Sequence, residues 1–156
     1  MGLDGEVAEI RRSRTIAAEA QAIWDVLADF GAVSSWAEFV DHSCLLEHSH
    51  DGGAVGVSRR VQLGRNTLVE RITDFQPPRA LGYDIEGLPR VLRHLHSSWT
   101  LQPVAAGVTE VTLTNVVDIG ANPVQRLAER IFCRVCVKQL DLLLAGLAKK
   151  VEGSHV

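Results

Sequence analysis

Long apolar runs, a concentrated basic face and a cysteine framework are all missing from this sequence. No apolar segment reaches the ~18 residues that a membrane-spanning helix needs, and the first residues contain no apolar run typical of a signal peptide. The formal net charge of −3 argues against nucleic-acid binding, which normally requires a concentrated basic face. Three cysteines are too few for a disulfide framework and indicate a reducing compartment. We therefore expect a cytoplasmic protein without a membrane span.

Sequence motifs for nucleotide binding and for hydrolysis through a covalent intermediate are also missing. The chain contains no phosphate loop, no dinucleotide fingerprint and no Gly-x-Ser-x-Gly nucleophile elbow. Cys133 and Cys136 do form a C-x-x-C motif, but it falls in the middle of a predicted helix, whereas redox pairs sit at a helix N-terminus. We interpret both cysteines as small buried hydrophobic residues.

Histidines form two closely spaced pairs, His48 with His50 and His94 with His96. A structural zinc site needs four ligands, which neither pair supplies alone. The two-residue period of a strand places His94 and His96 on the face opposite Leu95, so we expect both to be solvated. The sequence therefore predicts neither a metal site nor a bound cofactor.

What is present fits one globular domain. A hydrophobic fraction of 46% and a charged fraction of 22% are typical of a folded chain rather than a disordered one. A length of 156 residues suits a single domain. We expect one ligand-binding domain over residues 1–156, with its folded core at about 7–151.

The longest regular segment is a predicted amphipathic helix from Asn122 to about Val151. Asn122 is a favourable N-cap residue, and Pro123 suits the first helical position. The predicted apolar face is wider than a surface helix usually needs, so a large apolar surface must cover it. Its members recur at three- and four-residue steps and include Phe132, Cys136, Leu140, Leu143 and Leu147.

Ahead of this helix, the sequence predicts one strand, two short helices and six more strands. The two helices carry apolar residues on one face, and Gly31 separates them. Short turns rich in glycine, proline, asparagine and aspartate separate the later strands, as in the hairpins of an antiparallel meander. The predicted strands are 7–15, 39–47, 55–63, 67–75, 81–86, 93–103 and 109–118, and the predicted short helices are 17–29 and 32–38.

This order of elements predicts an α+β fold in which a curved, seven-stranded antiparallel sheet wraps around the long C-terminal helix. A sheet of this width is twisted, so it curls around the helix instead of packing flat against it. The middle of such an arrangement often stays open, and a hydrophobic ligand can bind there. We expect the mouth of the cavity between residues 64–66, residues 87–90 and the start of the last helix.

Polar residues interrupt the otherwise apolar faces that the strands turn towards this cavity. The two-residue period identifies them as Arg59, Glu70, Tyr83, Ser97 and Asn115. Arg59 and Glu70 fall on adjacent strands, and opposite charges in an apolar cavity should pair, because burying either alone is costly. The pair is either a polar anchor for a ligand or a structural ion pair that holds the sheet together. Tyr83 is either a hydrogen-bond donor to a ligand or a core aromatic residue.

Three other side chains carry separate expectations. Trp36 should lie near the mouth of the cavity, and Trp99 should face its interior, so both are expected to line it. Trp24 faces the core side of the first helix and is interpreted as a packing residue. Gln139 falls within the apolar face of the last helix, where a buried amide needs a partner. That partner is either a ligand or the backbone of the sheet.

Several stretches of the sequence resemble the START-like, or Bet v 1-like (SRPBCC), superfamily. The resemblance points to the polyketide cyclase/dehydrase-type proteins of bacteria and implies the helix-grip fold. This fold hosts lipid carriers, hormone receptors and cyclases, so the resemblance implies the fold more specifically than the function. It covers residues 7–151 and rests on residues 15–18, 23–30, 55–60, 69–72 and 97–101.

The sequence also resembles, more distantly, the plant abscisic-acid receptors, and this resemblance helps to locate the pocket. Glu70 matches a pocket glutamate, and His42 stands where those receptors have a lysine that pairs with the ligand. Because histidine stands in place of lysine, the pocket lacks a fixed positive charge that could pair with a ligand carboxylate at neutral pH. The gating loop is shortened here to residues 63–66, so the resemblance implies pocket geometry and not hormone reception. The expected ligand-binding residues are Trp36, His42, Arg59, Val61, Glu70, Tyr83, Ile85, Leu95, Ser97, Trp99, Leu113, Asn115, Phe132, Cys136, Gln139 and Leu140.

The leading functional hypothesis is the binding of a small hydrophobic molecule of the lipid, polyketide or isoprenoid type. The first alternative is an enzyme resembling polyketide cyclases or aromatases, in which Arg59 stabilises an enolate and Glu70, Tyr83 or His42 moves protons. The second alternative is a structural or interaction module with a filled core. We expect a monomer or a homodimer without a nucleic-acid partner.

Overall fold

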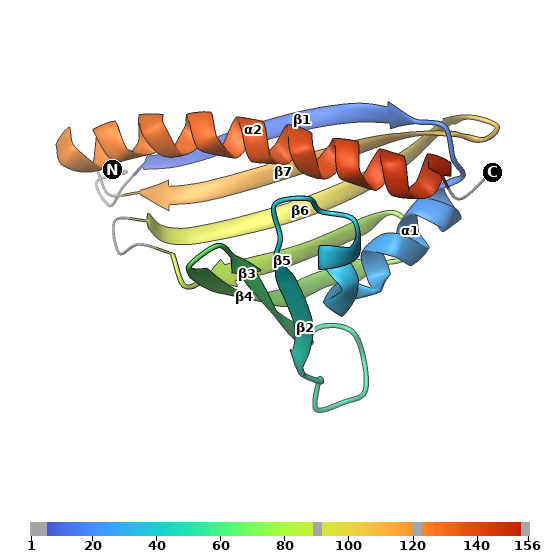
Figure 1. The fold of residues 1–156 in the computed structure, drawn as a ribbon, viewed down its shortest axis with the longest axis horizontal. Helices are drawn as coiled ribbons and strands as arrows, with labels where there is room; N and C mark the ends of the chain where they lie inside the picture. Colours follow the sequence, from blue (N-terminus) through green and yellow to red (C-terminus); the bar gives the residue numbers. More distant parts are fainter. Residues whose placement is uncertain (1–5, 89–91, 120–122, 154–156) are drawn as a thin grey trace.

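The computed structural model describes residues 6–88, 92–119 and 123–153, which form a curved sheet crossed by one long helix (Figure 1). The expected N-cap Asn122 and residues 89–90 of the expected cavity mouth lie outside the described residues. The elements are β1 (Glu6–Ile16), α1 (Ala20–Ala28), the 3-10 helix η1 (Phe30–Ser35), β2 (His42–Glu47), β3 (Ser58–Leu63), β4 (Asn66–Gln76), β5 (Ala80–Glu86), β6 (Leu92–Ala105), β7 (Val108–Ile119) and α2 (Pro123–Gly153).

The sheet is antiparallel throughout, with the strand order β1-β7-β6-β5-β4-β3-β2. Strands β2 to β7 follow one another as a meander, and β1 pairs with β7 at the far edge. Helix α2 contacts β1, β7 and α1, so it lies along the β1–β7 side of the sheet, away from β2 at the other edge (Figure 1). The predicted α+β helix-grip fold is confirmed.

Strand alternation separates buried from exposed side chains as the sequence predicts. On β3, Arg59 and Val61 are buried while Arg60 between them is exposed. The interpretation of Trp24 as a packing residue is confirmed, because its ring meets Phe75 edge-on with ring centroids 5.1 Å apart. The α1 helix thereby closes one end of the sheet with an aromatic contact.

The two short helices differ from their predicted bounds. Helix α1 begins at Ala20 and not at residue 17, because the chain first makes a tight turn in which the amide of Ala18 donates to the carbonyl of Ile16 at 2.9 Å. The second helix is a 3-10 helix that begins at Phe30, so Gly31 lies inside it. A Cβ added at Gly31 would lie 2.9 Å from the Leu45 side chain. This glycine therefore allows β2 to approach η1.

Gly146 lies inside α2 and does not end it. A Cβ added at Gly146 would collide with the backbone carbonyl oxygen of Trp36. Glycine is unfavourable in a helix interior, so its presence here needs a packing reason. The close approach of the segment after η1 supplies that reason, and it fixes where Trp36 sits relative to α2.

The histidines and cysteines take ordinary structural positions. His94 is exposed and His96 is half-buried, and both contact the Asp84 carboxylate, at 3.4 and 2.8 Å. His96 is therefore less solvated than the sequence predicts. Cys136 is buried as the sequence predicts, whereas Cys133 is only half-buried and Cys44 is exposed. Within the described ranges, no three His, Cys, Asp or Glu side chains are grouped closely enough to hold a metal ion, and no helix is long and apolar enough to cross a bilayer.

Candidate functional site

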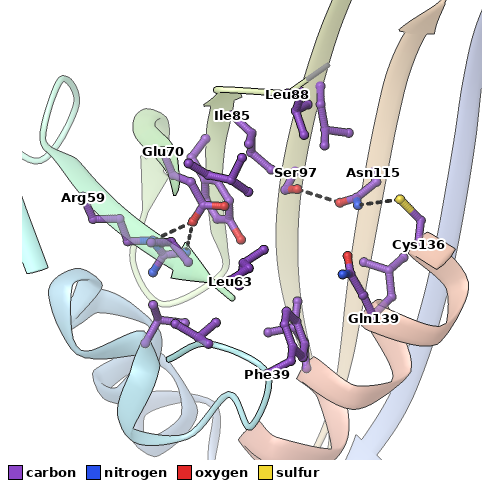
Figure 2. Close-up of a pocket in the computed structure, with 18 of the residues that line it drawn as sticks. Phe39, Arg59, Leu63, Glu70, Ile85, Leu88, Ser97, Asn115, Cys136 and Gln139 are labelled. Atoms are coloured by element: carbon purple, nitrogen blue, oxygen red, sulfur yellow. Dashed lines mark hydrogen bonds and ion pairs between the residues drawn. The ribbon is translucent and has the colours of Figure 1, made fainter. Parts of the chain in front are cut away.

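A cavity of about 250 Å³ lies between the concave face of the sheet and α2 (Figure 2). Strands β3 to β7 supply one wall, the segment from α1 to β2 supplies a second, and α2 supplies the third. The walls are mainly apolar. The polar lining residues are Arg59, Asn66, Glu70, Ser97, Asn115 and Gln139, together with the hydroxyl group of Tyr83.

Of the expected ligand-binding residues, all except His42 and Leu113 line this cavity. His42 is exposed on β2, the edge strand of the sheet, and its side chain is outside the cavity. Leu113 is fully buried in the main core, opposite Trp99 in the β6–β7 register, and does not reach the cavity. The predictions for both residues are therefore wrong. His42 lies on an edge strand outside the cavity, and Leu113 is covered by the packed core.

Several lining residues were missed by the sequence reasoning. Leu63 follows the same two-residue period as Arg59 and Val61, so that signal could have identified it. Phe39 and Val40 were expected in a strand, but they lie in the segment between η1 and β2 and close one side of the cavity. Their inward position depends on how η1 packs on the sheet.

Arg59 and Glu70 form a buried ion pair on directly opposed positions of β3 and β4. Nε and Nη2 of Arg59 lie 2.7 and 2.6 Å from the same oxygen, Oε1 of Glu70. Nη1 of Arg59 donates to the backbone carbonyl of Phe30 at 2.8 Å. The predicted pairing is confirmed, and the pair also ties η1 to the sheet.

Aromatic rings cover the guanidinium group of Arg59. Its carbon Cζ lies 3.8 Å from the ring centroid of Phe30 and 5.0 Å from that of Tyr83. The Phe30 and Tyr83 rings themselves meet edge-on, with centroids 5.5 Å apart. Cation–π attraction is strongest where the cation has lost its water, as here. Only 6% of the Arg59 side chain remains exposed.

Tyr83 is a neutral hydroxyl at physiological pH. Burial raises the pKa of its phenol to about 12, with a further contribution from the nearby charge of Glu70. The indole nitrogen of Trp99 donates to the phenol oxygen at 3.1 Å. Trp99 in turn packs edge-on against Trp36, with centroids 5.9 Å apart. Tyr83 is thus a rigid part of the wall that keeps its own proton.

A second polar cluster lies on the opposite side of the cavity from Arg59 and Glu70 (Figure 2). The hydroxyl of Ser97 donates to Oδ1 of Asn115 at 2.6 Å, and Nδ2 of Asn115 lies 3.9 Å from the sulfur of Cys136. Burial raises the pKa of the Cys136 thiol to about 11, so it stays protonated. This cluster joins β6, β7 and α2 with neutral groups only.

Gln139 projects from α2 towards the cavity, one helical turn from Cys136 (Figure 2). Its amide makes no hydrogen bond to any other side chain or to the sheet within the described residues. Of the two partners expected from the sequence, the sheet backbone is therefore not the one used. The amide can both donate to and accept from a bound molecule or water.

The mouth of the cavity lies where lining residues are also exposed. Asn66 at the start of β4, Gly87 after β5 and Val135 on α2 all meet both conditions. Asn66 and Gly87 fall on two of the segments that the sequence predicts around the mouth, whereas Val135 lies well beyond the start of α2, which was the third. Apolar Val135 continues outwards into Ile131 and Leu127 on α2, which are 59% exposed.

Comparison with known proteins gives a family and a set of similar structures. The sequence model of the family described as "Polyketide cyclase / dehydrase and lipid transport" matches residues 7–152. The chain belongs to this family. Its fold is similar to that of the Zhui aromatase/cyclase from Streptomyces sp. R1128, with a TM-score of 0.79 at 20% identity over 94% of each chain. It is also similar to a START superfamily protein from Mycobacterium smegmatis, with a TM-score of 0.74 at 14% identity over 93% of this chain and 97% of that chain.

A plant enzyme shares the fold as well. A point mutant of norcoclaurine synthase from Thalictrum flavum, in complex with a transition-state analogue, gives a TM-score of 0.76 at 13% identity over 97% of this chain and 98% of that chain. These identities are low enough that the three structures establish the fold alone. A comparison with curated proteins gave no match. The predicted START-like and Bet v 1-like resemblance is confirmed, and family and fold together suggest hydrophobic ligand binding or a role like that of a polyketide cyclase.

Proposed function

We propose that this protein binds one small apolar molecule in the cavity between the sheet and α2. The observation that carries the proposal is the cavity itself, about 250 Å³ of space with mainly apolar walls. Protein interiors are normally close-packed, so a cavity of this size in a small domain needs a reason. Burial of apolar ligand surface would supply the affinity, at roughly 25 cal/mol per Å².

The polar groups of the cavity would orient the ligand. They form two clusters on opposite sides, Arg59 with Glu70 and Ser97 with Asn115, with apolar side chains such as Leu63 between them (Figure 2). Ligand pockets commonly combine apolar walls with a few convergent polar groups in this way. The free amide of Gln139 is the group best placed to bond a ligand oxygen.

A cyclase-like reaction is the second candidate, supported by the family description and the similar aromatase/cyclase fold. Among the described lining residues, Glu70 is the one proton-transfer candidate that the geometry leaves for this reaction, and its Oε1 is already bonded to Arg59. His42 is outside the cavity, and the pKa of Tyr83 is about 12, far from the neutral range in which a general acid or base works best. Arg59 already has a partner at each of its three nitrogens. The binding function therefore has the stronger support.

The decisive experiment fills the cavity from one wall. Val61→Phe on β3 would project a larger ring into the space, whereas Val69→Phe on β4 adds the same ring outside it. We expect Val61→Phe to weaken the binding of 2-acetonaphthone at least about tenfold in calorimetry, with Val69→Phe unchanged. Native mass spectrometry of the purified protein should detect a co-purifying small molecule that is lost in Val61→Phe. No binding by the wild type, and no co-purifying molecule, would contradict the proposal.

A turnover assay separates binding from catalysis. A soluble poly-β-ketone surrogate would be incubated with the wild type and with Val61→Phe, and cyclised products would be followed by chromatography. Saturable binding without turnover is the expected result. Turnover by the wild type that Val61→Phe abolishes would instead support the cyclase candidate.

A further inference from the structure

We propose that the cavity selects uncharged ligands that carry a carbonyl or hydroxyl oxygen, and rejects the corresponding carboxylates. This inference rests on the proposed binding function and names the class of molecule that the same site accepts. It follows from how the charges of the cavity are arranged. Among the described residues that line it, Arg59 is the one cation and Glu70 is the one anion.

The positive charge of Arg59 is already balanced by Glu70. Each nitrogen of the guanidinium group has a partner: Nε and Nη2 contact Oε1 of Glu70, and Nη1 donates to the carbonyl of Phe30. The rings of Phe30 and Tyr83 lie against the group at 3.8 and 5.0 Å. A ligand carboxylate would have to displace Glu70 or share Arg59 with it, and Glu70 is itself buried with no other cation among the described lining residues.

The rest of the polar wall is uncharged. Ser97 and Asn115 are neutral groups bonded to each other at 2.6 Å. Tyr83 and Cys136 stay protonated because burial raises their pKa values, to about 12 and about 11. A carboxylate that entered would therefore lose its hydration without gaining a counter-ion, and an unpaired buried charge is strongly unfavourable.

Neutral oxygen atoms fit this wall better than charged ones and better than pure hydrocarbon. The amide of Gln139 can donate to a ketone, ester or hydroxyl oxygen, and its own oxygen can accept from a hydroxyl. An uncharged group leaves the Arg59–Glu70 pair intact. A volume of about 250 Å³ lies just below the range of roughly 300–1,000 Å³ typical of ligand pockets, so one or two fused rings suit it better than a long acyl chain.

The test uses three naphthalene probes of similar size whose substituents differ in charge. They are 2-acetonaphthone, which is neutral, 2-naphthoate, which is an anion at neutral pH, and 2-naphthylmethylammonium, which is a cation. Calorimetry on the wild type should give an affinity for the ketone at least about tenfold higher than for either ion. If none of the probes binds, the proposed function fails. If the naphthoate binds as tightly as the ketone, the function stands and the charge selection is wrong.

Two variants then locate the origin of the selection. Glu70→Gln leaves Arg59 without its counter-ion and should raise the naphthoate affinity at least about tenfold. Arg59→Gln leaves Glu70 unpaired and should raise the affinity for the naphthylmethylammonium cation by a similar factor. Glu110→Gln removes an exposed carboxylate on β7, outside the cavity, and should change neither affinity.

The two variants give opposite readouts, so either one that folds is sufficient. Circular dichroism identifies a folded variant before the titrations. A folded Glu70→Gln or Arg59→Gln variant with the wild-type order of affinities would overturn the assignment of selection to this pair. If neither variant folds, the three-probe comparison on the wild type alone decides whether the cavity prefers uncharged ligands.

Discussion

Replacing Gly146 by alanine should destabilise the protein, although alanine is the better helix former. Gly146 lies inside α2, where Gly→Ala normally stabilises by about 0.5–1 kcal/mol. Here the added methyl group would overlap the carbonyl oxygen of Trp36 at a separation that real Cβ atoms essentially never show. It would also lie 3.4 Å from the carbonyl carbon of Trp36 and 3.8 Å from Cα of Ala37. The contact is with backbone, so no side-chain rotation relieves it.

The magnitude follows from these two opposing effects. Forcing an extra methyl group into a packed interior typically costs about 1–3 kcal/mol, since the neighbouring backbone must move. Subtracting the helix-propensity gain of about 0.5–1 kcal/mol leaves a net loss of about 0–2.5 kcal/mol, with a middle value near 1 kcal/mol. For a chain of this length, the middle value corresponds to a drop in Tm of roughly 2–4 °C.

Urea unfolding of the wild type and the variant measures this difference directly. Gly153→Ala is the matched control, because it is also in α2 and a Cβ there would meet nothing within 4 Å. The control should be neutral or slightly stabilised. The reasoning is refuted if Gly146→Ala is as stable as Gly153→Ala with an unchanged dependence on urea. Because Trp36 lines the cavity, Gly146→Ala should also weaken 2-acetonaphthone binding.

Two further predictions concern the polar groups of the cavity. Glu70→Leu should lower the free energy of unfolding by about 3–5 kcal/mol, because it leaves Arg59 buried and unpaired. Combining Arg59→Met with Glu70→Leu should recover most of this loss. Equal losses for the single and the double variant in urea unfolding would contradict the prediction. Tyr83 is the only tyrosine, so its phenolate absorbance can be followed alone. Its pKa is raised from 10.0 to about 12 in the folded chain, so stability should be intact below pH 10.0 and fall as the pH approaches 12. Tyr83→Phe should reduce that fall, and a folded-state phenol that titrates near pH 10.0 would disprove the cause.

Most of the cavity wall could be predicted from strand periodicity. A two-residue repeat places alternate side chains on one face, which predicts that Arg59 and Val61 lie on the same side of β3. The pairing of Arg59 with Glu70 was predicted from the cost of burying a lone charge. The observed register places the two residues directly opposite each other and confirms it.

The errors arise where position depends on packing between elements. The resemblance to plant receptors predicts His42 in the cavity, but β2 is the edge strand and His42 is exposed there. Leu113 has the correct parity on β7, yet close packing buries it away from the cavity. The two-residue period of a strand shows on which face a side chain lies, but it does not show which other residues cover that side chain.

The sequence alone determined the order of elements, the α+β class and the inward faces of the strands, because these depend on local periodicity and turn chemistry. It also determined that the last helix carries an apolar face in need of cover. Only the tertiary structure decided what happens to the charge of Arg59. The carbonyl and ring of Phe30 reach it from η1, twenty-nine residues away along the chain. Such long-range contacts depend on how helix and sheet pack, which no local pattern records, and they make the cavity electrically neutral.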